Sequence, residues 1–183
     1  MPNAAVMKKK YIYEDYLKTP DDIRYELIEG ELIMTPAPNI KHQEISRELG
    51  YRMIKFVKDN DLGKVFYAPC DVYLDQENVV QPDILFVSKE RLDIIGEKNI
   101  QGAPDLVVEI ISESNAYRDT IQKKRLYARF GVKEYWIVAP GEEMIEVYRL
   151  DNQGYQLSRT YFHGDTLESQ VLKGFNVELK EIF

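Results

Sequence analysis

The chain has 183 residues, of which 44% are hydrophobic and 30% are charged, an ordinary composition for a globular protein. This length can bury a substantial core, so we expect one domain that spans residues 1–183. No apolar run approaches the roughly 20 residues of a membrane helix. No apolar segment follows the basic triplet Lys8–Lys10 either, so the sequence supports neither a membrane span nor a secretory signal.

Cys70 is the only cysteine, so an internal disulfide and a zinc site built on Cys/His clusters are both excluded. A cytoplasmic location is therefore the expectation. The formal net charge of −7 argues against a protein that binds phosphates over its whole surface. The charge is uneven, however, because residues 117–133 contain six basic side chains and one acid.

The chain begins with a predicted short helix over 11–17 and a predicted hairpin. Glu29-Gly30 separates two strand-like segments, 24–28 and 31–35, in the manner of a two-residue hairpin turn. Prolines follow the second segment and end it.

A long amphipathic helix is predicted next, from Asn39 to about Asn60. Asn39 is suited to cap the amino end, and apolar residues then recur at three- and four-residue steps. The same stripe reaches His42, so we expect this imidazole to lean toward the sheet from the first turn of the helix.

Two strand-like segments in the middle of the chain each carry an acid. Residues 79–87 place Asp83 before an apolar run, and residues 104–112 are apolar on both alternating faces except at Glu109. Apolar residues on both faces are typical of a central strand that helices cover on both sides. An unpaired carboxylate is costly there, so Glu109 needs a cation, a backbone donor or a metal ion as its partner.

A second long helix is predicted over 119–130, with Gly131 as its stop, and a buried strand over 134–139. The rest of the chain alternates between glycine-containing turns, which favours an antiparallel extension. The elements expected there are strands over 144–150 and 155–162, a strand near Leu167 and a last short helix over 178–183.

This order of elements predicts a mixed α/β fold in which Asp83 and Glu109 lie on neighbouring central strands. Two carboxylates, together with backbone and water oxygens, would suit Mg²⁺, which usually keeps several waters. Spacing alone leaves a structural alternative open. Asp83 would then be a turn residue after proline, and Glu109 would form a salt bridge with a helix lysine.

The helix over 119–130 favours the metal-site interpretation. Projection at 100° per residue places Lys123 and Lys124 on its apolar side. One of these lysines can extend its ammonium past the apolar stripe to solvent, but a second lysine there is expected to pair with a buried acid. Two acids and an amine suit metal-assisted phosphodiester hydrolysis. Arg125 and Arg129 lie on the polar face, where they would either contact phosphate or form an ordinary solvated surface.

Several segments together resemble the Uma family of putative restriction endonucleases, which lies within the PD-(D/E)XK nuclease superfamily. The resemblance covers nearly the whole chain. It is carried by residues 25–31 (Tyr-Glu-Leu-Ile-Glu-Gly-Glu), Pro82-Asp83 with the apolar run after it, residues 103–112, Lys123 to Tyr127, and residues 131–138.

The resemblance implies a restriction-endonuclease-like mixed sheet flanked by helices, and a metal site for Mg²⁺ or Mn²⁺. Asp83 and Glu109 would be its two acids, and the carbonyl of Ile110 would complete the metal shell. The superfamily pattern has lysine two residues after the second acid, but here that residue is Ile111. Lys123 would therefore replace it from the following helix.

The resemblance also makes Glu31 and His42 candidate accessory residues, with Glu26 as a further one; the alternative for each is a structural hydrogen bond at the end of an element. The leading hypothesis is a Mg²⁺-dependent DNA endonuclease that acts through Asp83, Glu109 and Lys123. A catalytically inactive nucleic-acid-binding or adaptor protein and a purely structural ion network are the alternatives. The oligomeric state stays open, although concerted cutting of both strands would need two sites and so favours a homodimer.

Overall fold

The computed structural model describes residues 9–20, 22–112 and 117–183. Its helical segments are α1 (Tyr13–Tyr16), α2 (Ile40–Asp59), the 3₁₀-helix η1 (Lys89–Ile94), the π-helix η2 (Arg118–Lys123), α3 (Lys124–Phe130) and the 3₁₀-helix η3 (Leu179–Glu181). In this part of the chain, no helix combines the length and the apolar character that crossing a membrane would require.

Most strands belong to two sheets, one of six strands and one of five. The six-stranded sheet has the order β11-β10-β9-β8-β6-β3. Its members are β3 (Gly63–Tyr67), β6 (Ile84–Ser88), β8 (Leu106–Ile110), β9 (Glu134–Ala139), β10 (Met144–Asp151) and β11 (Gly154–Phe162). The five-stranded sheet has the order β2-β1-β5-β4-β7. Its members are β1 (Tyr25–Ile28), β2 (Glu31–Met34), β4 (Val72–Asp75), β5 (Asn78–Val80) and β7 (Ile100–Gln101).

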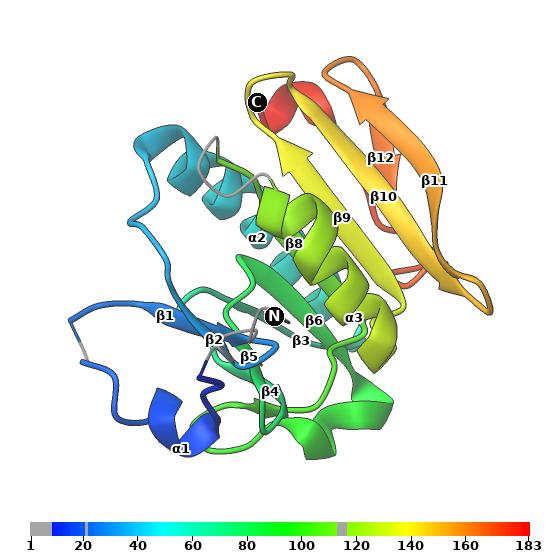
Figure 1. Cartoon of the computed structure of the whole chain (residues 1–183). Coiled ribbons are helices and arrows are strands. Elements are labelled where there is room, and N and C mark those ends of the chain that lie inside the picture. Colours follow the sequence, from blue (N-terminus) through cyan, green and yellow to red (C-terminus); the bar gives the residue numbers. More distant parts are fainter. Residues whose placement is uncertain (1–8, 21, 113–116) are drawn as a thin grey trace.

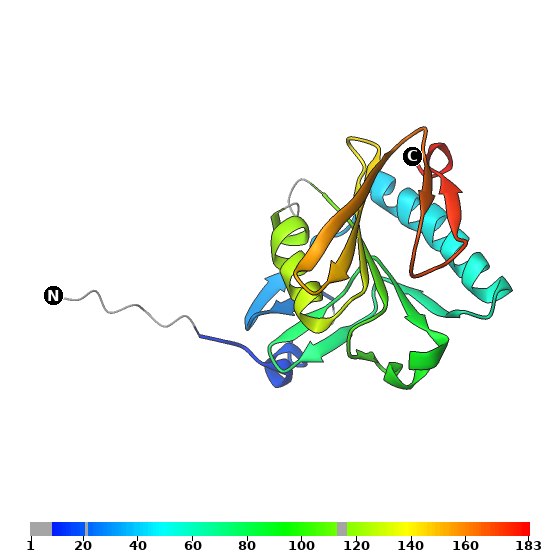
Figure 2. The ribbon, with the colours of Figure 1, turned by 90° about the vertical axis from the view of Figure 1, so that its right-hand side faces the viewer.

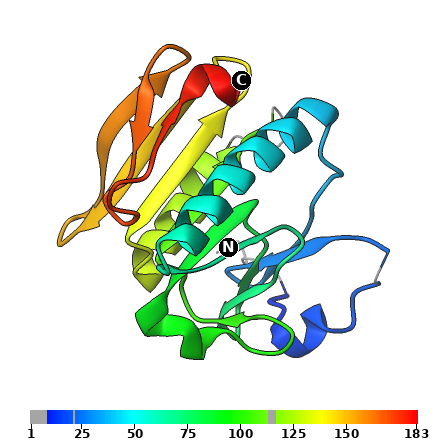
Figure 3. The ribbon, with the colours of Figure 1, turned by 180° about the vertical axis from the view of Figure 1, so that it is seen from behind.

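Helices cover both faces of the six-stranded sheet. β8 and β9 are parallel, so the chain must cross over between them, and η2 and α3 form that crossover. These helices lie in front of the sheet in Figure 1, whereas α2 crosses its opposite face, which is turned to the viewer in Figure 3. The central strand β8 is buried along its whole length for this reason.

The two faces of β8 enter different parts of the core. Leu106, Val108 and Ile110 pack with the apolar stripe of α2, whereas Val107 packs with apolar residues of α3. Side chains alternate along a strand, so Glu109 shares the face of Val107 and points toward the η2–α3 side. The apolar run thus fixes the direction of its one carboxylate.

A small ribbon of β12 (Thr166–Glu168) and β13 (Asn176–Glu178) completes the fold. It lies beside α2 in Figure 2. The rings of Phe175, just before β13, and Phe56 of α2 meet edge to face at 5.5 Å between centroids. The buried Glu134 carboxylate holds the segment before β13, because it accepts hydrogen bonds from Ser169 Oγ (2.7 Å) and Gln170 N (3.0 Å).

The expected mixed α/β fold with an antiparallel carboxyl-terminal extension is confirmed, but one strand prediction is wrong and two helices differ from the prediction in type or length. The strand predicted over 79–87 is two strands, β5 and β6, in different sheets, because Pro82 interrupts the pairing. The helix predicted over 119–130 begins as the π-helix η2. The last helix is the short η3, preceded by β13. The sequence also favours a turn over 112–116, but residues 113–116 lie outside the described residues.

Candidate active site

Asp83 lies directly before β6, and Glu109 lies on the neighbouring strand β8. β6 and β8 pair antiparallel with Ile84 opposite Val108, and the same register continued by one residue places Asp83 opposite Glu109. The backbone N–H of Ile110 donates to Asp83 Oδ2 at 2.7 Å. This hydrogen bond fixes the Asp83 carboxylate beside the residue that follows Glu109, as the adjacent-strand prediction requires.

His42 contacts the same carboxylate from α2. Its Nε2 lies 3.2 Å from Asp83 Oδ2, and its Nδ1 is buried without a hydrogen-bond partner in the described part of the chain. The side chain of Asn39 accepts a hydrogen bond from His42 N at 2.8 Å and so caps the helix as predicted. The imidazole therefore leans toward the sheet, as the helical stripe predicted.

Lys123 is the cation at the centre of the site. Its Nζ lies 2.8 Å from Glu26 Oε1, 2.9 Å from Glu109 Oε1 and 3.6 Å from Asp119 Oδ1. Its side chain is only 5% exposed. Buried lysine must be paired, and here three carboxylates from three different elements surround the ammonium.

The π-helix η2 supplies both Asp119 and Lys123, four residues apart on one side. Single π-helical turns are rare and occur often at functional sites. One turn further along, Tyr127 donates its hydroxyl to Glu109 Oε1 at 2.7 Å. Tyr135 Oη donates to the backbone carbonyl of Asp119 at 2.8 Å and holds η2 against the sheet.

The electrostatics follow from one buried ammonium among several acids. Burial raises the pKa of the Glu109 carboxyl well above its usual range, although Lys123 acts against this shift. Burial likewise raises the pKa of Asp119, to about 6. Burial by itself would lower the pKa of Lys123, but the carboxylates of Glu109, Glu26 and Asp119 outweigh it and raise that pKa well above its usual range. Lys123 is therefore charged, and protons or a cation must balance the remaining acids.

These side chains line a cleft of about 810 Å³. Its floor holds the acids and Lys123, and its walls come from the segment before α2 and from the loop after β9. The residues of the two walls include Thr35, Pro36, Ala37, Pro38, Lys41, Pro140, Gly141 and Glu142. The candidate site therefore lies where the two sheets meet and opens to the surface.

The donor set fits a hard divalent cation. Asp83 and Glu109 accept their hydrogen bonds at Oδ2 and Oε1. Their second oxygens, with the Ile110 carbonyl, are the hard ligands that Mg²⁺ prefers. Among the described residues, no three His, Cys, Asp or Glu side chains form a ready metal cage. Mg²⁺ does not need one, because it typically binds one or two carboxylates and keeps several waters.

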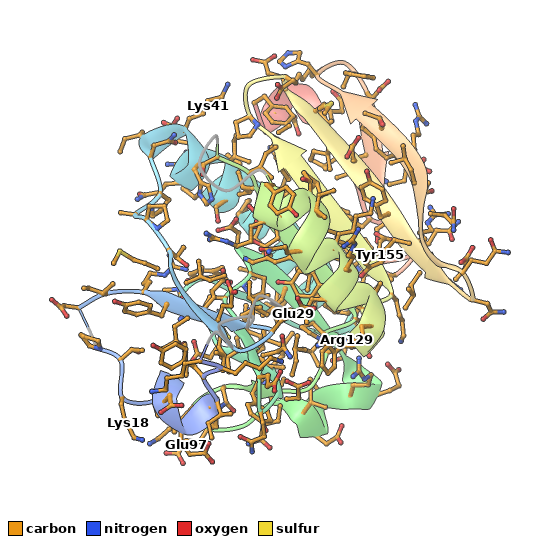
Figure 4. The ribbon with its side chains drawn as sticks, in the orientation of Figure 1. Lys18, Glu29, Lys41, Glu97, Arg129 and Tyr155 are labelled. Carbon is orange, nitrogen blue, oxygen red and sulfur yellow. The ribbon has the colours of Figure 1, made fainter. Side chains whose placement is uncertain are left out.

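Of the other predicted site residues, some line the cleft and others lie elsewhere on the protein. His42 and Glu26 line the cleft, whereas Glu31 is exposed at the start of β2 and is not among the residues that line it. Arg129 lies 3.8 Å from Glu29 and 4.0 Å from Asp75, and Figure 4 places it beside Glu29, far from Lys41 of the cleft. Arg125 borders a separate, smaller pocket next to α3 and β11.

Sequence reasoning missed several polar residues of the cleft, among them Asp119, Arg24 and Gln81. The signal for Asp119 was present, since an acid four residues before a lysine on one helix can pair with it. Arg24 stands two residues before Glu26, a spacing that puts both side chains on one side of an extended segment. Gln81 gave no signal, because it lies between two strands that the sequence did not separate.

Comparisons with known proteins bear on the family and the fold. A family model described as "Uma2: Putative restriction endonuclease" matches residues 13–180. The chain is also similar to a solved structure, "a putative nuclease belonging to DUF820 from Anabaena variabilis ATCC 29413", with a TM-score of 0.77 and 21% sequence identity. That match covers 93% of this chain and 96% of the other, and it shows that the fold is shared. A search of curated proteins gives no significant match. With a family model that spans almost its whole length, the chain belongs to the Uma2 family of putative restriction endonucleases.

Proposed function

We propose that the protein is a metal-dependent DNA endonuclease that hydrolyses phosphodiester bonds at the cleft. The observation that carries this proposal is the antiparallel register that sets Asp83 opposite Glu109, with Lys123 Nζ 2.9 Å from Glu109. The family of putative restriction endonucleases supports the reaction class. Mg²⁺ or Mn²⁺ is the proposed cofactor, and DNA is the proposed substrate.

Asp83, Glu109 and the Ile110 carbonyl would hold the cation. When bound, it would polarise the phosphate and lower the pKa of a water molecule. The Ile110 N–H and His42 orient the Asp83 carboxylate, and Tyr127 orients that of Glu109. Their role is to keep two negative groups at a fixed separation, which the repulsion between them would otherwise increase.

Lys123 would orient the attacking water and balance charge. The raised pKa of its ammonium keeps it protonated at neutral pH, so in the metal-free protein it can donate hydrogen bonds but cannot accept a proton. Its contact with Glu109 places it beside the proposed metal ligands. Removal of the proton from the attacking water therefore falls to solvent or to a second group, and the role of Lys123 is to orient that water.

Nicking of supercoiled plasmid by the purified full chain tests the proposal. We expect nicking with Mg²⁺ or Mn²⁺, no nicking with a chelator, and loss of nicking in Asp83→Asn and Glu109→Gln. Asp93→Asn, an exposed acid on η1, is the matched control and should nick like the parent. A parent that binds DNA but never nicks it would support the alternative, a nucleic-acid-binding protein without catalysis. Nicking that persists in both site variants would place the reaction elsewhere.

A further inference from the structure

Three cations line the cleft: Arg24, Lys41 and Lys123. Lys123 is fully engaged by the acids of the floor. Lys41 lies on the α2 wall, where its Nζ donates to the Pro140 carbonyl at 2.6 Å. Arg24 stands just before β1 and beside Thr35, whose N–H donates to the Arg24 carbonyl at 2.8 Å. Within the described ranges, Arg24 has no carboxylate at salt-bridge distance, and its side chain contacts the amide of Gln81. The cleft therefore offers an arginine that no acid of the described residues neutralises.

Gln81 holds the Arg24 side chain in place. Arg24 Nε donates to Gln81 Oε1 at 3.0 Å. At the other end of the same amide, Gln81 Nε2 donates to Asp71 Oδ1 at 2.7 Å and to Tyr16 Oη at 3.2 Å. An amide that is bonded at both ends cannot rotate freely. Among the described residues, only Nε of the guanidinium has such a partner, so its two Nη groups keep their donors for a ligand.

Arg24 is also tied to the catalytic floor. Gln81 N donates to Glu26 Oε1 at 2.8 Å, the same oxygen that meets Lys123. Arg24 and Glu26 are two residues apart in an extended segment, so their side chains leave it on one side. A group bound at Arg24 would consequently lie next to the floor of the cleft, not on a remote surface.

We propose that Arg24 binds a phosphate of the DNA backbone next to the phosphate that is cut. This inference rests on the proposed function. The planar guanidinium fork matches two phosphate oxygens, and an acidic floor needs a cation at its edge to keep a polyanion close. Arg129 suits this role less well, because Glu29 and Asp75 already lie within 4.0 Å of it.

The test is the affinity for a DNA duplex, measured by fluorescence anisotropy of a labelled oligonucleotide across a salt series. Ca²⁺ replaces Mg²⁺, and the intact length of the duplex is checked on a gel afterwards. Arg24→Gln should weaken binding by roughly tenfold and lower the slope of log affinity against log salt by about one. Gln81→Ala should weaken binding by a smaller factor, since the guanidinium stays but loses its support.

Arg159→Gln is the matched control, because it removes one arginine from the exposed strand β11, where Arg159 pairs with Asp165. It should bind like the parent. A parent that binds DNA while Arg24→Gln keeps the same affinity and salt slope would overturn the Arg24 assignment and leave the proposed function standing. The Arg24 assignment would also fail if, of these variants, only the Arg125→Gln, Arg129→Gln double variant lowered the slope of log affinity against log salt. The phosphate contact would then belong to the polar face of α3. A parent that neither binds nor cleaves DNA would overturn both proposals.

Discussion

Lys123 Nζ and Glu26 Oε1 lie 2.8 Å apart, although the lysine belongs to the crossover helix of one sheet and the glutamate to a strand of the other. Glu26 is 1% exposed, and its second oxygen, Oε2, has no hydrogen-bond partner in the described part of the chain. The contact joins the two sheets at the floor of the cleft. The position of the ammonium thus depends on the amino-terminal hairpin as well as on its own helix.

Two adjacent lysines should differ sharply in their effect on cleavage. Lys123 is buried among acids, whereas Lys124 Nζ lies 3.4 Å from the centre of the Tyr148 ring, outside the cleft. Lys123→Ala should lower the nicking rate by roughly 10²- to 10⁴-fold, and Lys124→Ala should keep it within a few-fold. Lys123→Met, which preserves the length of the buried chain, separates lost charge from lost packing. If Lys124→Ala were inactive and Lys123→Ala active, the catalytic lysine would be Lys124. If both alanine variants were active, no lysine of this helix would serve the site.

The sequence predicted the parts of the site that depend on local pattern. The apolar run around Glu109 indicates a central strand, and helical periodicity indicates a buried amine at Lys123 or Lys124. The choice of Lys123 came from the family resemblance and not from periodicity. Asn39 as a helix cap follows from local hydrogen bonding in the same way. Each of these features is decided within one turn or one strand.

The parts that depend on how distant segments pair were not predictable. Val79-Val80 and the run after Asp83 are both apolar on both faces, so pattern alone cannot assign them to different sheets. The role of Glu26 arises only when β1 pairs with β5 and brings that hairpin beside β6. The family resemblance pointed to Glu26, but the physical reason for it lies in the contact between the sheets.

Metal binding should appear as a gain in thermal stability. In the proposed site, Asp83 and Glu109 repel each other without a cation, and a ligand that binds only the folded state raises the melting temperature by mass action. Asp83→Asn should melt higher than the parent in chelator and respond less to Mg²⁺ or Mn²⁺. Scanning calorimetry with and without metal measures both effects, and Asp93→Asn serves as the control for removal of one acid. Equal metal responses in the parent and in Asp83→Asn would exclude the shared site.

The metal-free protein should lose stability as the pH rises from about 4 to 6. The pKa of Asp119 is about 6 in the folded protein against an ordinary value of 3.8, so the folded state binds more protons than the unfolded state in this window. The free energy of unfolding therefore falls as the pH rises through it. Asp119→Asn should flatten this fall. Urea unfolding in chelator at pH 4, 5, 6 and 7 gives the measurement, and a slope identical to that of the parent would show that Asp119 ionises normally.

Replacement of Glu26 should separate the structural part of its role from the electrostatic part. Glu26 Oε1 accepts from both Gln81 N and Lys123 Nζ. Glu26→Gln keeps an oxygen that can accept both hydrogen bonds, so the free energy of unfolding should stay close to that of the parent. Glu26→Leu leaves the Gln81 N–H without its acceptor and should lower the free energy of unfolding by about 1–3 kcal/mol.

Both Glu26 variants remove the negative charge that helps to raise the pKa of Lys123. We therefore expect slower nicking in both, and an alkaline limb of the pH–rate profile that moves to lower pH because Lys123 loses its proton more easily. The stable variant Glu26→Gln is the informative one, since its fold is kept. If Glu26→Gln nicks at the parental rate with an unshifted profile, Glu109 alone is enough to hold the ammonium, and the contact between the sheets serves only folding.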